Sequence, residues 1–119
     1  MGGLAMALAV LAFQATPPVV PATCGIEFIH RPTGADVANY YPQAAFPQKL
    51  PGNTAINCVV ASDLRLTQCV VTLEDPAGYG FGDATIKYFT TNARGQAVDV
   101  NGVSCVGQHV KAHFRWQFS

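Results

Sequence analysis

Apolar and polar residues alternate strictly along the C-terminal segment 109–118, which shows the clearest pattern in the chain. A period of two places successive side chains on opposite faces of a strand, so that one face is buried and the other is wet. The segment therefore predicts a half-buried β-strand. Its polar face carries Lys111, His113 and Arg115.

Two further alternating runs, 54–61 and 64–73, are rich in β-branched residues and predict an antiparallel hairpin. A turn centred directly after Asp63 places Cys58 opposite Cys69. Directly opposed Cβ atoms lie about 4.5–5.5 Å apart, which is near the reach of a disulfide. In an oxidising compartment this register favours a Cys58–Cys69 disulfide, and two buried thiols are the alternative. The same register assigns these residues to one apolar face: Ile56, Cys58, Val60, Thr67, Cys69, Val71 and Leu73.

Helical segments are expected before and after this hairpin. Thr33 and Asp36 can each cap a short helical turn, and a proline suits the start of a second turn over 42–46. The longest helix is expected over 83–91, with Asp83 at its N-cap or in its first turn, where a carboxylate meets free N–H groups. The order helix, strand, strand, helix, strand predicts an α+β fold: a three-stranded antiparallel sheet with two helices on one face.

The first 26 residues carry no charged side chain, and the ten residues 4–13 are all apolar. A signal-peptide core needs about 7–15 apolar residues, whereas a bilayer-spanning helix needs roughly 20. We therefore expect residues 1–22 to be a signal peptide or a short hydrophobic anchor, with a buried N-terminal helix as a third reading. The remaining residues, 23–119, are enough for one small domain of an exported protein.

Four cysteines in a short exported chain favour disulfides, and three pairings are possible on paper. If Cys58 pairs with Cys69, subtraction alone leaves Cys24 with Cys105.

A formal net charge of +0 removes the simplest electrostatic case for nucleic-acid binding, which requires a basic excess. A zinc site is not expected, because His109 and His113 would lie roughly 13 Å apart on a strand. The loop at Gly80 lacks the further glycine of a dinucleotide fingerprint, since Thr85 stands at that position. We expect neither an enzyme nor a cofactor.

If the strand 109–118 lies at a sheet edge, it offers unpaired backbone groups. Such an edge is often protected by charge, and it is also how several modules capture an extended peptide. The residue pattern leaves both readings open.

Several stretches occur in the order and spacing of a known family: Tyr40–Ala45, Cys58–Val60, Cys69–Val71, Glu74–Pro76, Gly80–Ala84, Asn101–Val103 and Arg115–Phe118. Together they resemble the C-terminal domain of TonB, in the subgroup with two hairpin cysteines. The resemblance implies the same helix–strand–strand–helix–strand fold in the periplasm, with the last strand pairing with a segment of an outer-membrane receptor. The family commonly has glycine where Leu64 stands, so a left-handed turn residue there would be strained.

We therefore expect a non-enzymatic periplasmic module that contacts an outer-membrane receptor, or a similar envelope partner, by strand addition. The expected contact residues are those of the last strand: His109, Val110, Lys111, Ala112, His113, Phe114, Arg115 and Trp116. The alternatives are a membrane-anchored energy transducer for TonB-dependent transport and an exported structural protein that self-associates as a homodimer. Membrane contact is expected only through an uncleaved N-terminus.

Overall fold

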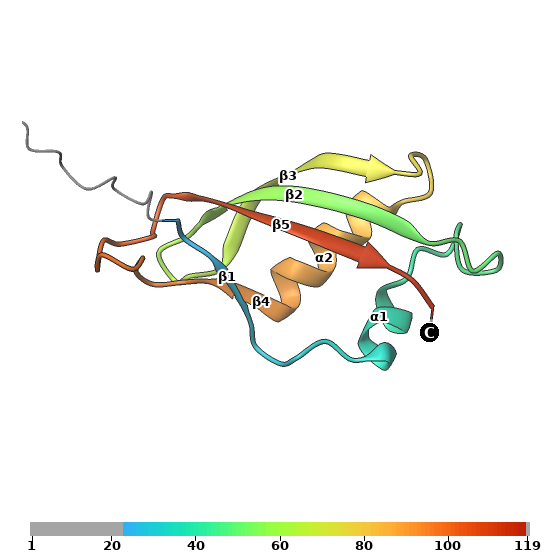
Figure 1. The fold of residues 1–119 in the computed structure, drawn as a ribbon, viewed down its shortest axis with the longest axis horizontal. Coiled ribbons are helices and arrows are strands. Elements are labelled where there is room, and N and C mark those ends of the chain that lie inside the picture. Colours follow the sequence, from blue (N-terminus) through green and yellow to red (C-terminus); the bar gives the residue numbers. More distant parts are fainter. Residues whose placement is uncertain (1–22, 119) are drawn as a thin grey trace, which may run out of the picture.

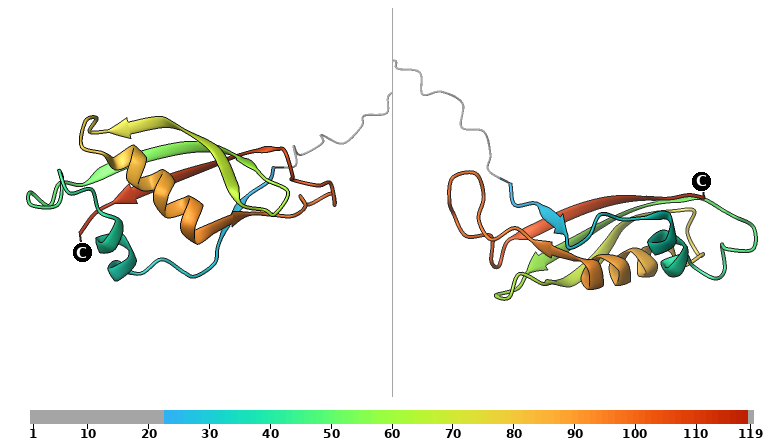
Figure 2. Two further views of the ribbon diagram at one scale, coloured as in Figure 1. Left: turned by 180° about the vertical axis from the view of Figure 1, so that it is seen from behind. Right: turned by 90° about the horizontal axis from the view of Figure 1, so that it is seen from below.

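The structure is a computed structural model that describes residues 23–118, and the expected signal peptide or anchor lies outside them. The described elements follow in this order: β1 (Ile26–Phe28), α1 (Gly34–Tyr40), β2 (Gly52–Val60), β3 (Leu66–Asp75), α2 (Phe81–Asn92), β4 (Ala93–Gly95) and β5 (His109–Trp116). Strands β3, β2 and β5 form an antiparallel sheet in that spatial order, so β2 is central and β5 lies at one edge (Figure 1). Both helices lie on one side of this sheet (Figure 2), which confirms the predicted α+β fold.

The structure contains the predicted disulfide between Cys58 of β2 and Cys69 of β3, whose Cα atoms are 4.0 Å apart. The predicted register holds in the middle of the hairpin, where Ile56 is opposite Val71. It fails toward both ends, because the pairing shifts between Ala55 and Ile56 and again between Asn57 and Val59.

These two shifts change which residues of β3 face the core. At the second shift Gln68 takes a φ of 51°, typical of an extra residue inserted into one strand. Leu66 is consequently buried opposite Val60, whereas Leu73 is 44% exposed. The prediction that Thr67 and Leu73 belong to the core face was therefore wrong, since each extra residue reverses the alternation of the strand.

The hairpin turn has a left-handed residue at Leu64, with a φ of 70°. A side chain in this conformation costs about 1 kcal/mol or more relative to glycine. Neighbouring contacts hold the backbone there: the Leu64 N–H donates to the Ala61 carbonyl at 2.8 Å, and the Leu64 carbonyl accepts from Gly95 at 2.8 Å. The Leu64 side chain also packs against the core.

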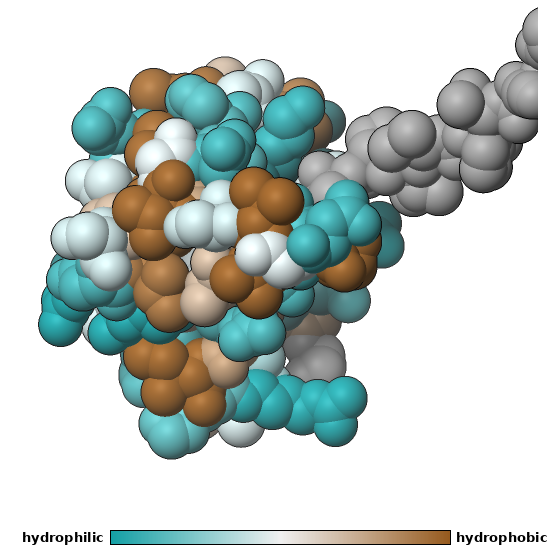
Figure 3. Space-filling model, turned by 90° about the vertical axis from the view of Figure 1, so that its left-hand side faces the viewer, coloured by the Kyte–Doolittle hydropathy of each residue, from teal (hydrophilic) through white to brown (hydrophobic). Residues whose placement is uncertain are grey.

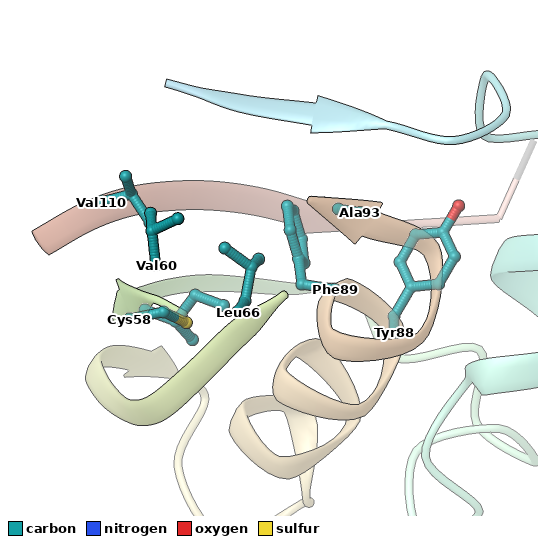
Figure 4. Packing of buried hydrophobic residues seen from close by; sticks show 8 residues of the cluster. Cys58, Val60, Leu66, Tyr88, Phe89, Ala93 and Val110 are labelled. Atoms are coloured by element: carbon teal, nitrogen blue, oxygen red, sulfur yellow. The ribbon is translucent and has the colours of Figure 1, made fainter. Parts of the chain in front are cut away.

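The larger core cluster fills the space between the sheet and α2 (Figure 4). Every second residue of β2 is buried, as its alternating pattern predicts. The cluster consists of Ile56, Cys58, Val60, Leu66, Tyr88, Phe89, Ala93 and Val110. The Cys58–Cys69 disulfide thus lies in the core and not on the surface.

Helix α2 begins at Phe81, two residues before the expected start at Asp83. Gly80 occupies the N-cap in a left-handed conformation with a φ of 87°, and Asp83 lies in the first turn. The helix packs closely on β3 at Gly82, where an added Cβ would be 2.8 Å from Cγ2 of Val71.

Thr33, one of the two residues expected as a cap, is the N-cap of helix α1 and forms a capping box with Asp36. Asp36 donates its backbone N–H to the Thr33 hydroxyl at 3.2 Å, and Thr33 donates its backbone N–H to the Asp36 carboxylate at 3.0 Å. The segment expected as a second helical turn, 42–46, forms a turn in which the Phe46 N–H donates to the Pro42 carbonyl at 3.0 Å.

Strands β1 and β4 form a second, two-stranded antiparallel sheet that the sequence did not predict. Each strand has three residues, which is too short for a recognisable two-residue period. Cys24, just before β1, forms a disulfide with Cys105, with their Cα atoms 5.8 Å apart. This is the pairing that subtraction had left.

Candidate partner-binding edge

β5 pairs with β2 along its whole length without a register shift. Trp116 is opposite Gly52 at one end and His109 is opposite Val59 at the other. β3, at the other edge of the same sheet, contains both register shifts of the hairpin. Bulges twist an edge strand and interrupt its regular row of hydrogen-bonding groups. β5 is therefore the edge of this sheet suited to accept a further strand.

The backbone groups of alternate β5 residues point away from β2. The Val60 N–H donates to the Gln108 carbonyl at 3.0 Å, which marks these two residues as a hydrogen-bonded pair. Such pairs recur at every second residue of an antiparallel ladder, so the next residues of β5 bonded to β2 are Val110, Ala112, Phe114 and Trp116. The outward-facing N–H and C=O groups belong to the outer row, which we define as His109, Lys111, His113 and Arg115. Within residues 23–118, no backbone hydrogen bond reaches this row from outside the sheet.

The outer row also carries the exposed side chains of β5. The imidazole of His109 is hydrogen-bonded through Nδ1 to Oδ1 of Asn57 at 2.8 Å. Among the described residues, neither Lys111 nor Arg115 lies within ion-pair distance of a carboxylate; the ion pair found there joins Arg65 to Asp63 at 3.4 Å. Two unpaired positive charges therefore lie along the open edge.

The other four predicted contact residues point toward the core. The side chains of Val110 and Trp116 are 1% and 0% exposed, so a partner at the edge cannot touch them. Ala112 and Phe114 are half-buried and border the edge on the helical face. The eight predicted residues thus divide into the exposed outer row, two half-buried residues at the edge, Ala112 and Phe114, and two buried residues, Val110 and Trp116, that hold the strand in place.

A buried hydrogen-bond network fixes the C-terminal end of β5 to α2. Trp116 donates its indole N–H to the Thr85 hydroxyl at 2.8 Å, and Thr85 donates to the Phe81 carbonyl at 2.7 Å. Oγ1 of Thr54 lies 2.7 Å from Oγ1 of Thr85. Since the single hydroxyl proton of Thr85 is directed to Phe81, Thr54 is the donor in this contact. Sequence reasoning missed this role of Thr85, although its position on the buried helix face, four residues after Phe81, was available as a signal.

Cavities flank both ends of β5. At the C-terminal end, a cavity of about 370 Å³ between α1 and the strand is lined in part by Val37, Tyr41 and Phe118. At the N-terminal end, a cavity of about 500 Å³ is lined in part by Lys111 and Asp99. β1 lies closest to the first residues of β5 and diverges from the strand toward α1 (Figure 1).

The ionisable groups with shifted pKa values lie away from the outer row. Burial raises the pKa of Tyr41. Burial also raises the pKa of Tyr88, with smaller contributions from Asp36 and Tyr40.

No group of three or more His, Cys, Asp and Glu residues that could hold a metal ion occurs within residues 23–118. In the same part of the chain, no helix has the length and apolar character needed to cross a membrane.

The loop between β4 and β5 exposes several valines, at the end of the molecule opposite the C-terminus (Figure 1). Val100 is the most exposed, at 86%, and Val98, Val103 and Val106 are also exposed. Viewed from this end, hydrophobic side chains are interspersed with hydrophilic ones (Figure 3). They do not form one continuous apolar face.

Neither a family model nor a curated protein matches the chain. The resemblance to the TonB C-terminal domain therefore stays a prediction. Residues 23–118, which the structure describes, form a small α+β fold with two disulfides and with β5 as a regular edge strand. Disulfides persist in oxidising compartments, so this pair indicates an extracytoplasmic protein.

Proposed function

We propose that this protein is a non-enzymatic binding module of the periplasm, in which β5 pairs with an extended segment of an outer-membrane receptor or a similar envelope partner. The observation that carries the proposal is the outer row, whose backbone groups have no protein partner among the described residues. Strand addition uses such groups for affinity and the neighbouring side chains for specificity.

The contacts that hold β5 in place support this function. A strand that accepts a guest without refolding loses less conformational entropy on binding. β5 is held by β2 along eight residue pairs, by the Trp116–Thr85 hydrogen bond at one end and by the neighbouring Cys24–Cys105 disulfide at the other.

Charge disfavours the alternative in which two copies pair through β5. In an antiparallel pair centred on His113, Lys111 of one copy lies opposite Arg115 of the other. Like charges directly opposite each other are destabilising, and other registers again place the outer row against itself. A partner with a different sequence avoids this conflict.

Photocrosslinking in intact cells tests the proposal. A photoreactive residue at position 113 lies in the outer row, and one at position 87 lies on the exposed face of α2 as a control. We expect position 113 to give an adduct of discrete mass with an envelope protein and position 87 to give none. Adducts of the chain with itself alone, or equal adducts from both positions, would contradict the proposal.

A further inference from the structure

The chemistry of the outer row specifies the kind of segment that β5 accepts, provided that strand addition at β5 is the function. When a strand pairs with β5, its residues directly opposite the outer row lie on the same solvent-exposed face. Its intervening residues lie on the helical face, beside Ala112 and Phe114. This matching of faces holds for parallel and antiparallel guests, because side chains alternate in both.

The solvent face opposite Lys111 and Arg115 supplies no negative charge from the adjacent strand. Their partners on β2 are Asn57 and Asn53, which are neutral. The next carboxylate across the sheet is that of Asp75, which is paired with Asn53 on β3 and therefore lies two strands away, roughly 10 Å from Arg115. At physiological salt, an exposed charge at that distance is largely screened.

The start of β5 does not compensate Lys111 either. Asp99 lines the same cavity as Lys111, but no ion pair joins them among the described residues. Oδ1 of Asp99 accepts hydrogen bonds from the backbone N–H groups of Asn101 at 2.7 Å and Val103 at 3.1 Å. This carboxylate is therefore engaged within its own loop.

The helical face at the edge is apolar. Phe114 is half-buried and contacts Phe89 and Tyr88, with ring centroids 5.7 Å and 5.5 Å apart. Beyond the end of β5, the cavity lined by Val37 and Phe118 continues this apolar border toward α1. Side chains of a guest that point to this face therefore meet hydrophobic surface.

We infer that β5 selects an extended segment in which carboxylate residues alternate with apolar residues. The carboxylates pair with Lys111 and Arg115 on the solvent face, and the apolar side chains rest against Ala112 and Phe114. A second copy of this chain does not have this chemistry on its own β5, since its outer row carries positive charge.

Two blocked peptides of nine residues test the inference with the full chain in fluorescence anisotropy. In one, glutamate alternates with valine; in the other, lysine replaces every glutamate. We expect the glutamate peptide to bind about tenfold more tightly, because two cross-strand ion pairs each contribute a factor of a few. We expect this preference to shrink as salt is raised.

A charge-reversed variant provides the matched comparison. Lys111→Glu with Arg115→Glu should reverse the preference, whereas Lys49→Glu with Lys87→Glu, which makes the same change in net charge elsewhere, should leave it intact. Equal binding of both peptides to the unmodified chain would overturn the inference while leaving strand addition standing. Binding of neither peptide would overturn strand addition at β5 itself.

Discussion

Trp116 of β5 donates its indole N–H to the Thr85 hydroxyl of α2 at 2.8 Å, and both side chains are fully buried. The hydroxyl has no freedom in this arrangement, because it accepts from Trp116 and Thr54 and donates to Phe81. The edge strand is therefore anchored to the helix by directed bonds as well as by apolar contact.

Thr85→Val should lower the free energy of unfolding by about 2 kcal/mol, because it leaves the buried indole N–H of Trp116 without an acceptor. The Thr54 hydroxyl keeps an acceptor in the Phe114 carbonyl at 3.3 Å. Urea denaturation followed by tryptophan fluorescence measures the change. Thr90→Val is the control on the same helix: the Thr90 hydroxyl makes an exposed 3.3 Å bond to Lys87, and we expect a change within about 0.5 kcal/mol. Equal effects of the two substitutions would show that the network contributes no stability.

The two disulfides should contribute unequally. Cys24 and Cys105 are 81 positions apart, whereas Cys58 and Cys69 are 11 apart. On the chain-entropy model, the longer loop contributes about 4.5 kcal/mol and the shorter about 3 kcal/mol. Chemical denaturation of the two double alanine variants under oxidising conditions measures this order, and reductant should remove most of the difference from the unmodified chain. A larger loss from removing Cys58–Cys69 would indicate that its role in core packing outweighs loop closure.

Gly95→Ala and Gly34→Ala should have opposite effects. An added Cβ at Gly95 would lie 2.5 Å from Cγ2 and 3.2 Å from Cβ of the buried Val60, so the core must shift. We expect a loss of about 2 kcal/mol from this overpacking. At Gly34, in the first turn of α1, an added Cβ meets no atom within 4 Å, and we expect a gain of about 0.5 kcal/mol. Thermal unfolding of both variants decides the signs, and destabilisation by Gly34→Ala would contradict the prediction.

Proline substitutions at neighbouring positions should separate folding from partner binding. Phe114→Pro removes an N–H that bonds to β2 and should cost about 3 kcal/mol or more, whereas the His113 N–H faces the open edge. We expect His113→Pro to retain the fold, because proline is tolerated where the N–H of an edge strand faces solvent. The same variant should lose the envelope adduct when the photoreactive residue is moved to position 111. Circular dichroism and crosslinking together measure the contrast, and unfolding by His113→Pro would show that the outward assignment of its amide is wrong.

Stability should fall as the pH rises above 10.0, the ordinary pKa of tyrosine. Because burial raises the pKa values of Tyr41 and Tyr88 in the folded chain, the unfolded chain releases these protons first. The stabilisation is therefore complete below pH 10 and is lost as the pH approaches the raised values. Urea midpoints on both sides of pH 10 measure the fall, and Tyr88→Phe should make it shallower. An unchanged slope in that variant would contradict the assignment to Tyr88.

The elements that the sequence predicted correctly are those governed by short-range rules. The alternation in 109–118 depends only on the two-residue period of a strand, and the N-cap at Thr33 depends on bonds within one helical turn. The pairing of Cys58 with Cys69 required only that the middle of one hairpin keep its register.

The features that escaped prediction depend on contacts distant in sequence. The bulge at Gln68 leaves no mark in the alternating pattern of β3, and the short strands β1 and β4 pair with each other across most of the chain. For the candidate site, alternation predicted which side chains of β5 are exposed. It could not predict which amides face outward, because that phase is fixed by the pairing of Val60 with Gln108.

The Cys24–Cys105 disulfide determines how the domain would respond to pulling. A tensile force that entered at residue 23 and left through β5 would cross from Cys24 to Cys105 through covalent bonds, and the chain between these cysteines would lie outside the load path. Strand β3 and helix α2 would then be mechanically shielded. The force would pass from Cys105 along the backbone to His109. From there it would act on β5 and on the hydrogen bonds that join β5 to β2.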